Sequence, residues 1–301
     1  MEKLKGHAAM IGAEVMWGVS APVGTAILAT GVAPMLLTDC RIIGAAVLFW
    51  IVSLLSRRRE KVSPPDLLKM FFASLLGIVI NQGCFVWGLS LTSPIDASII
   101  TTSLPILTMV MAAIVLREPV TGMKVTGVLL GAAGALILVT SGHGGAGSGS
   151  AAGDILVICA QLSFTCYLVL FKDLISRYSA VTLMKWMFSY ASICVIPFTY
   201  SEWTPEVWAA MEPATLGGIA FFVLGPTFLS YLLLPVGQSN LRPTVTAMYN
   251  YVQPVVATAV AIAAGLGVFT LATAISVVLV FTGVFLVTRS KSRADMERET
   301  A

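Results

Sequence analysis

The stretch that decides the fold is residues 95–140, IDASIITTSLPILTMVMAAIVLREPVTGMKVTGVLLGAAGALILVT. It holds two apolar runs, 95–116 and 122–140, on either side of a short charged connection. Each run is close to the ~20 residues that an α-helix needs to cross a bilayer. The same pattern continues in both directions through a chain of 301 residues, of which 57% are hydrophobic and 11% charged. Soluble domains carry about 25% charged residues, so we expect an all-α membrane protein.

The breaks between the apolar runs predict ten transmembrane helices. Their expected ranges are 7–29, 34–55, 70–90, 95–116, 122–140, 154–173, 181–200, 214–236, 243–263 and 269–288. A Gly/Ser-rich stretch at 142–153 predicts a flexible linker between a first unit, residues 1–141, and a second unit, residues 154–288. Residues 289–301 form a charged tail.

The positions of the basic residues predict the orientation of these helices. With a cytoplasmic N-terminus, all but one of the 18 Lys and Arg residues fall in cytoplasmic segments, and the exception is Arg41. The charged residues of the opposite connections are all acidic, which agrees with the positive-inside rule. We therefore expect both termini in the cytoplasm, in a multi-pass protein of the plasma membrane, which is the inner membrane of a bacterium.

The two units also align with each other as an internal repeat. An offset of 149 residues places Pro94 on Pro243, Pro105 on Pro254, Thr121 on Thr270 and Gly134 on Gly283. An offset of 147 residues places Glu14 on Gln161. Because each unit has five predicted helices, an odd number, the second must enter the membrane from the opposite side. Inverted repeats of this kind are typical of alternating-access transporters.

Several motifs carry a resemblance to a known family. They are DCRI at 39–42, NQGCFVWGLSLTSPIDAS at 81–98, LPIL at 104–107, LREPVT at 116–121 and the glycine-rich run at 127–134. Over nearly its whole length the chain resembles the EamA family of the drug/metabolite transporter superfamily. The resemblance implies a secondary transporter that exports amino acids, related metabolites or drug-like compounds. One departure is that Glu118 of the first unit corresponds to Gly267 in the second.

Glu14 is the candidate for proton coupling. An ionisable side chain inside a membrane span is costly and is a functional candidate by default. Trp17, three residues further on, shares its helix face and is a candidate substrate contact. Gln161 has the same shape without the charge, so one titratable group would suit a single coupled proton. The alternative is a packing carboxyl group hydrogen-bonded to a neighbouring helix.

The other candidate substrate contacts are polar or aromatic side chains within the predicted helices. Arg41, about 10 Å from the outer end of its helix, could orient an anionic substrate group or extend to the outer headgroups. The remaining candidates are Asn81, Gln82, Trp87, Ser98, Tyr167, Trp186, Tyr231, Tyr249, Asn250 and Gln253. All of these could instead form interhelical hydrogen bonds or packing contacts.

Two prolines and one charged cluster complete the expectations. Pro105 and Pro254 occupy matching positions and are candidate hinges, because proline kinks a helix. Arg117, Glu118 and Lys124 are expected at the cytoplasmic surface, where an exposed ion pair contributes only ~0–1 kcal/mol.

Other function classes find little support in the sequence. No GxxxxGK[ST] motif is present, so ATP hydrolysis is not expected. The sequence shows no catalytic cluster of acidic or histidine residues, so we expect no enzyme, no metal site and no cofactor. A net charge of +3 does not suggest nucleic acid. The expected partners are the lipid bilayer and a small-molecule substrate, and a facilitative uniporter, an exchanger, a monomer and a homodimer all remain open.

Overall fold

The computed structural model describes residues 2–56, 60–92, 94–141, 150–199, 203–209, 211–263 and 268–291. All the secondary structure in these ranges is helical, with no strand. The helical elements of the first half are α1 (Glu2–Ala29), α2 (Pro34–Leu55), α3 (Pro64–Ser74), η1 (Leu75–Ile80), α4 (Asn81–Leu91), α5 (Pro94–Thr101), α6 (Leu104–Val115) and α7 (Gly122–Ser141). Those of the second half are α8 (Ala151–Leu170), α9 (Lys172–Arg177), α10 (Ala180–Thr199), α11 (Pro205–Ala209), α12 (Pro213–Phe222), η3 (Val223–Leu229), α13 (Ser230–Asn240), α14 (Pro243–Met248), η4 (Tyr249–Tyr251), α15 (Val252–Ala263) and α16 (Leu271–Arg289).

Local sequence signals explain where several helices begin. Proline stands in the first turn of α2, α3, α12 and α14, where its missing N–H costs no helical hydrogen bond. Ser63 and Thr270 accept hydrogen bonds from backbone N–H groups three residues later. Such side-chain caps satisfy donors that have no partner within the helix.

Seven of the described helices, or continuous helical runs, are long and apolar enough to cross a membrane. They cover 34–55, 64–88, 122–140, 151–170, 180–199, 213–240 and 271–289. The predicted unbroken helix at 95–116 is wrong, because a turn at Thr102 and Ser103 separates α5 from α6. A 3₁₀ segment, η4, likewise interrupts the run that begins at Pro243. The structure is therefore that of an all-helical membrane protein, and the count of ten spans stays a prediction.

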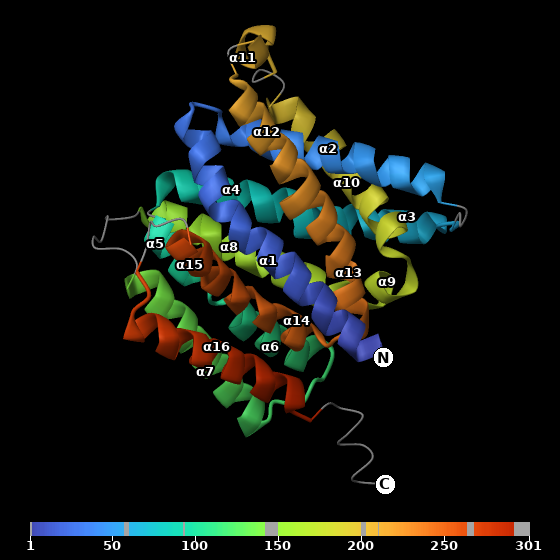
Figure 1. Cartoon of the computed structure of the whole chain (residues 1–301). Helices are drawn as coiled ribbons and strands as arrows, with labels where there is room; N and C mark the ends of the chain where they lie inside the picture. Colours follow the sequence, from blue (N-terminus) through green and yellow to red (C-terminus); the bar gives the residue numbers. More distant parts are fainter. Residues whose placement is uncertain are drawn as a thin grey trace.

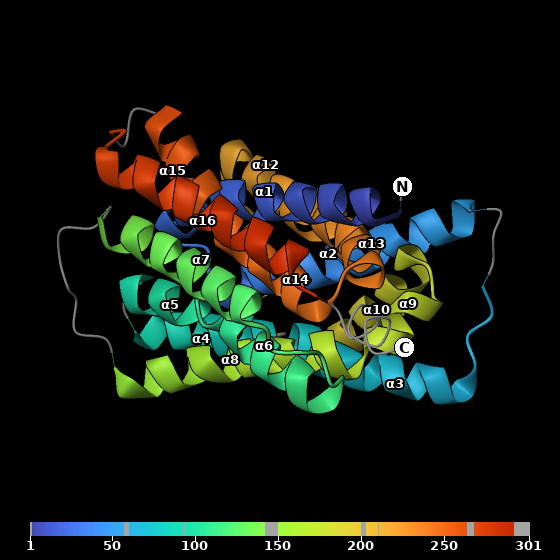
Figure 2. The same cartoon turned by 90° about the horizontal axis from the view of Figure 1, so that it is seen from below.

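The helices lie side by side in a bundle, with the N-terminus, the start of α3 and α9 at one end and α5 and α15 towards the other (Figures 1 and 2). α1 packs on α13 and α15, while α8 packs on α4 and α6. α2 pairs with α10, and α7 pairs with α16. When the two halves of the chain are exchanged, the contacts of α1 with α13 and α15 correspond to those of α8 with α4 and α6. The α2–α10 and α7–α16 pairs each join equivalent helices of the two halves.

The π-helical turns follow the same repeat. η1 covers Leu75–Ile80 and η3 covers Val223–Leu229, so the 149-residue offset carries the first onto the last six residues of the second. π-helices are rare and are frequent at functional sites. A polar side chain of the candidate site lies two residues after the end of each, namely Gln82 after η1 and Tyr231 after η3.

Glycines allow equivalent close approaches of helices in both halves. A Cβ atom on Gly88 of α4 would lie 2.9 Å from the carbonyl oxygen of Gly153 in α8. In the other half, Gly237 of α13 meets Gly6 of α1, where a Cβ atom would lie 3.4 Å from the Gly6 carbonyl oxygen. Small residues at these positions let the helix backbones pack closely.

The expectation of an exposed ion pair at Glu118 and Lys124 is wrong. The Lys124 Nζ atom lies 2.9 Å from Glu118 Oε2, and the two side chains are only 1% and 8% exposed. Thr244, at the start of α14, donates a second hydrogen bond of 3.1 Å to the same carboxylate oxygen. The sequence could not show this, because α14 covers the pair from the other half of the chain.

Candidate functional site

The site is built around the Glu14 carboxyl group. Glu14 is 3% exposed in the middle of α1, and Gln253 Nε2 donates a hydrogen bond of 2.6 Å to its Oε2 atom. Among the described residues no Lys or Arg lies within ion-pair distance of it. Gln253 lies in the first turn of α15, so this bond joins the two halves of the chain.

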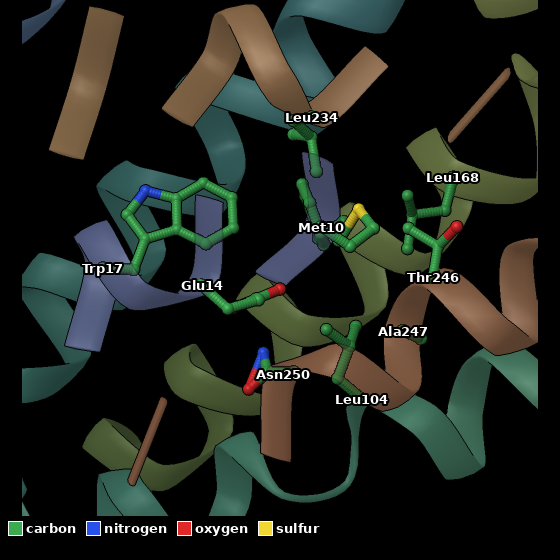
Figure 3. Close-up of a pocket in the computed structure, with 10 residues that line it drawn as sticks. Met10, Glu14, Trp17, Leu104, Leu168, Leu234, Thr246, Ala247 and Asn250 are labelled. Atoms are coloured by element: carbon green, nitrogen blue, oxygen red, sulfur yellow. The ribbon is translucent and has the colours of Figure 1, made fainter. Parts of the chain in front are cut away.

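A small cavity of about 20 Å³ lies beside Glu14, which is room for roughly one water molecule. In Figure 3 the Glu14 carboxyl group projects from α1 towards the space bordered by Met10, Leu104 and Asn250. The lining residues are Met10, Glu14, Trp17, Leu104, Phe164, Leu168, Leu234, Thr246, Ala247 and Asn250. They come from α1, α6, α8, α13 and the α14–η4 segment, so both halves of the chain contribute.

Trp17 connects this cavity to a second group of polar side chains. Its Nε1 donates a hydrogen bond of 2.7 Å to the carbonyl oxygen of Pro226 in η3. Its ring meets the ring of Tyr231 edge-on, with centroids 5.8 Å apart. The wide π-helical turn explains the first contact, because its carbonyl groups are not all used within the helix.

Two interhelical hydrogen bonds join residues that correspond in the repeat. Gln82 Nε2 donates a hydrogen bond of 3.1 Å to the Tyr231 hydroxyl oxygen. The Tyr251 hydroxyl donates a hydrogen bond of 3.0 Å to the carbonyl oxygen of Thr102. Both pairs are separated by 149 residues, which is the offset that aligns the two halves. Gln82 and Tyr231 therefore meet where the two halves face each other.

Arg41 lies next to this meeting point. Its Nε donates a hydrogen bond of 2.9 Å to Thr227 Oγ1 in η3, and its guanidinium carbon lies 5.5 Å from the centroid of the Phe222 ring. Thr227 precedes Tyr231 by four residues, about one helical turn, so Arg41 contacts the same helical segment close to Tyr231. None of the described carboxylates lies within ion-pair distance of Arg41.

Other predicted site residues lie elsewhere in the bundle. Asn81 donates a hydrogen bond of 2.9 Å to the Ala160 carbonyl oxygen and joins α4 to α8. Trp87 is 60% exposed on α4, and Trp186 packs between Trp50 and Tyr190. Neither tryptophan lies with the polar side chains around Glu14 and Tyr231. The side chain of Ser98 lies outside the described residues.

Tyr167 and Gln161 are buried on α8. The Tyr167 hydroxyl donates a hydrogen bond of 3.0 Å to Gln238 Oε1, and its ring packs where a side chain on Gly77 of η1 would otherwise lie. Tyr167 therefore holds α8 against α13 and η1. Gln161 sits one helical turn from Val157, which is fully buried against α4.

The two prolines stand at the breaks in their helices. Pro105 lies in the first turn of α6, directly after the Thr102–Ser103 turn, and Pro254 lies in the first turn of α15, directly after η4. In these positions they remove no hydrogen bond from the middle of a helix. The breaks correspond in the repeat, and a hinge role for these prolines stays a prediction.

Sequence reasoning missed two residues of the site, His7 and Thr246. His7 Nδ1 lies 2.7 Å from the Tyr249 hydroxyl oxygen and connects the start of α1 to η4. Thr246 Oγ1 lies at the cavity and has no hydrogen-bond partner among the described residues. Thr227 is fully buried beside Arg41. His7 lies seven residues before Glu14, and this spacing on one helix face was the available signal.

The arrangement offers binding groups and one buried carboxyl group. The described residues contain no group of three His, Cys, Asp or Glu side chains placed to hold a metal ion. The neutral hydrogen-bonding groups that surround Glu14 and Arg41 can hold a small polar ligand in an otherwise apolar bundle.

Comparisons with known proteins agree with this description. The sequence model of the EamA-like transporter family matches residues 4–140 and 151–289. The uncharacterized transporter YetK of Bacillus subtilis is 20% identical over 216 residues, which cover 71% of this chain and 66% of YetK. An uncharacterized transporter of Archaeoglobus fulgidus is 25% identical over 201 residues, 66% of this chain and 68% of that protein. The matches thus span about two thirds of these relatives.

Two further likenesses concern a plant protein and the fold. Protein WALLS ARE THIN 1 of Arabidopsis thaliana is 32% identical over 121 residues, which cover 40% of this chain and 31% of the plant protein. A solved crystal structure that is 18% identical covers 95% of this chain and 96% of its own, with a TM-score of 0.78. That likeness shows that the two proteins share a fold.

Proposed function

The chain belongs to the EamA-like transporter family and is a multi-pass integral membrane protein, and from this premise we propose that it is a secondary transporter. It moves small metabolites, namely amino acids, related compounds or drug-like molecules, outward across the plasma membrane, the inner membrane of a bacterium. Transport follows alternating access and is coupled to protons through Glu14. The carrying observation is the buried Glu14 carboxyl group beside the central cavity.

The proposed architecture is ten transmembrane helices in two inverted units, 1–141 and 154–288, joined by the linker 142–153, with both termini in the cytoplasm. Matching contacts support the inverted relation: α1 with α13 corresponds to α8 with α4. The two π-helices and the two helix breaks also follow the 149-residue offset. In transporters built from inverted repeats, the substrate binds near the membrane midplane between the repeats.

Alternating access is supported by the size of the central cavity. A cavity of about 20 Å³ is far below the ~300 Å³ at the lower end of small-molecule sites. A metabolite can therefore bind only when the helices around Glu14 and Trp17 separate. The breaks before Pro105 and Pro254 are where α6 and α15 can change direction relative to the preceding segments.

Proton coupling is supported by the surroundings of Glu14. The carboxyl group is nearly inaccessible, and its one hydrogen-bond partner among the described residues is the neutral Gln253 amide. A carboxylate without a cationic partner is strongly disfavoured in an apolar interior, so the group holds a proton when the cavity is closed. Exposure to water on opening lets it release that proton. Gln161, at the matching position, cannot do this.

The test is the Glu14→Gln variant in proteoliposomes with an imposed pH gradient. We expect gradient-driven accumulation of substrate to be lost, while the variant folds normally and still exchanges substrate down its own gradient. Glu2→Gln, a change of the same kind at an exposed position of α1, serves as the control and should behave as the wild type. Undiminished gradient-driven accumulation by Glu14→Gln would refute proton coupling through this residue.

The second candidate is a facilitative uniporter or exchanger of neutral or zwitterionic metabolites. It is favoured by the hydrogen bond from Gln253 to Glu14, which fits a carboxyl group that packs between helices instead of exchanging protons. The same experiment separates the two, because a uniporter or exchanger shows no response of wild-type accumulation to the pH gradient.

A further inference from the structure

Arg41, Gln82 and Tyr231 form a cluster whose hydrogen-bonding capacity the described protein does not fill. Arg41 uses its Nε on Thr227 and faces the ring of Phe222. The nearby acidic residue of the same helix, Asp39, accepts a hydrogen bond of 3.1 Å from Trp203 instead. The described part of the chain thus provides Arg41 with neutral partners only.

Gln82 provides an acceptor that is also unused. Its side chain is 7% exposed, and its Oε1 atom has no hydrogen-bond partner in the described structure. Its Nε2 donates to the hydroxyl oxygen of Tyr231, so the hydroxyl proton of Tyr231 remains available for donation. Tyr231 is 5% exposed, and water does not readily reach either side chain.

Both open positions are unfavourable unless a ligand fills them. Burying an unpaired charge or an unpaired acceptor costs free energy that a partner restores. A guanidinium group has a planar set of donors that fits a carboxylate. A buried amide oxygen requires a donor. Gln82 bonds to Tyr231 itself, and Arg41 bonds to Thr227, four residues before Tyr231, so a single compact ligand can reach both.

We propose that the Arg41–Gln82–Tyr231 cluster binds a 2-hydroxy monocarboxylate. The ligand carboxylate accepts hydrogen bonds from the Arg41 guanidinium group and the Tyr231 hydroxyl. The ligand hydroxyl on carbon 2 donates to Gln82 Oε1. This assignment rests on the proposed transport function, since it names the substrate class for the site that opens between the two halves.

The neutral acceptor favours a hydroxyl over an ammonium group on carbon 2. A buried ammonium group requires an anionic partner or several acceptors, and the described surroundings of the cluster offer one amide oxygen. The Glu14 carboxyl group lines a cavity together with Trp17, and its Oε2 atom accepts a hydrogen bond from Gln253. One guanidinium group also does not suit a dianion. A monoanion on Arg41 together with a proton on Glu14 leaves no uncompensated charge in the bundle.

The experiment measures binding to purified protein in detergent, by calorimetry, for four compounds on one carbon skeleton. They are 4-methylpentanoate, 2-hydroxy-4-methylpentanoate, 2-amino-4-methylpentanoate and the amide of the 2-hydroxy acid. The wild type should bind the 2-hydroxy acid most tightly. We expect a loss of about 10- to 100-fold for the amide, which lacks the charge, and of about tenfold for the acid without the hydroxyl.

Two variants should each remove one of these discriminations. Arg41→Gln should reduce the affinity for the 2-hydroxy acid to that for its amide. Gln82→Leu should abolish the preference for the 2-hydroxy acid over the unsubstituted acid and keep the preference for acids over the amide. Ser192→Ala on α10, a residue that bonds only its own helix backbone, is the control and should leave all four affinities unchanged.

Three results would overturn the proposal. They are no binding of any of the acids by the wild type, tighter binding of the 2-amino acid than of the 2-hydroxy acid, and unchanged selectivity in Gln82→Leu that still elutes and melts as the wild type does. Arg41→Lys keeps the charge, so partial retention of acid binding there shows that Arg41→Gln did not act by misfolding. Because no pH gradient is involved, a failure of proton coupling in the Glu14→Gln test leaves this result intact.

Discussion

The same connection between two helices occurs once at each end of the molecule, and the two copies differ in chemistry. Between α6 and α7, Thr121 Oγ1 accepts a hydrogen bond of 3.2 Å from the backbone N–H of Lys124. Before α16, Thr270 Oγ1 accepts a hydrogen bond of 3.2 Å from the backbone N–H of Thr273. The helix starts are equivalent. The Lys124 side chain, however, forms a buried ion pair with Glu118, whereas the second copy has Thr273 and Gly267 at these positions.

This difference shows that a repeat can keep its backbone signals and still specialise at one end. The Glu118–Lys124 pair also accepts a hydrogen bond from Thr244 of α14, so it ties the α6–α7 connection to the other half of the chain. In the proposed topology this end faces the cytoplasm. The opposite connection keeps the threonine cap in the described residues and has no lysine. We therefore expect the two ends to contribute unequally when the transporter opens.

The largest effect should come from breaking the ion pair. Lys124→Met leaves the Glu118 carboxylate buried without its cation, and breaking a buried pair typically destabilises by about 3–5 kcal/mol. We expect a marked fall in the Tm of the variant in detergent, measured by tryptophan fluorescence. The double variant Glu118→Gln with Lys124→Met should be more stable than Lys124→Met alone, because no unpaired charge remains.

The matched change at the other end is Thr273→Met. Thr273 occupies the position that corresponds to Lys124, and its replacement breaks no ion pair. It should lower the Tm much less than Lys124→Met. Equal effects of the two substitutions would contradict the inequality between the ends.

A smaller and equal effect is expected from the two threonine caps. Thr121→Ala and Thr270→Ala each remove a side chain that accepts from a backbone N–H at a helix start. Such caps are typically worth about 1 kcal/mol. The two Tm shifts should agree within error, and replacement by Ser should restore both. A clear difference between them would show that the helix starts are not equivalent.

The smallest effect on stability is expected at Glu60, which bonds to the residue before α10. Glu60 accepts hydrogen bonds of 3.1 and 2.8 Å from the backbone N–H and the hydroxyl of Ser179, before α10. A second contact between the two halves is the hydrogen bond that Trp203 donates to Asp39 of α2. Partial burial raises the pKa of Glu60, but hydrogen bonds from Thr182 and Ser179 and the charge of Lys185 outweigh it, so the pKa lies below its usual value near 4.5.

A lowered pKa means that Glu60 adds to the stability of the folded protein at neutral pH, and that this contribution is lost as the pH falls through the lowered pKa. We expect a slight additional fall of Tm below about pH 4.5 in the wild type, measured as a pH series in detergent. Glu60→Gln should lack this component. A wild-type series that overlays that of the variant would show that the Glu60 contact adds nothing to stability.

The sequence predicted the family, and the family match confirms it. It also predicted the membrane class and the approximate helix boundaries, since apolar runs and prolines act locally. It missed the break at Thr102 and Ser103, because the run 95–116 as a whole has the length of one span, although Pro105 marks the start of a new helix there. Of the candidate site, Glu14 with Gln253 and Gln82 with Tyr231 come together, while Trp87 is exposed. Side chains on one helix do not reveal which neighbour they will face.

The sequence by itself determined that this chain lies in a membrane, approximately where most of its long helices begin and which residues align between its halves. These features depend on hydrophobicity, proline and caps, which act over a few residues. Only the tertiary structure decided which charges are buried and paired. Glu118 and Lys124 read as surface residues until α14 covers them, and Arg41 differs from them because the described structure brings no carboxylate to it. The burial of the Glu118–Lys124 pair and the partner of Arg41 depend on residues more than 100 positions away, and no local pattern records them.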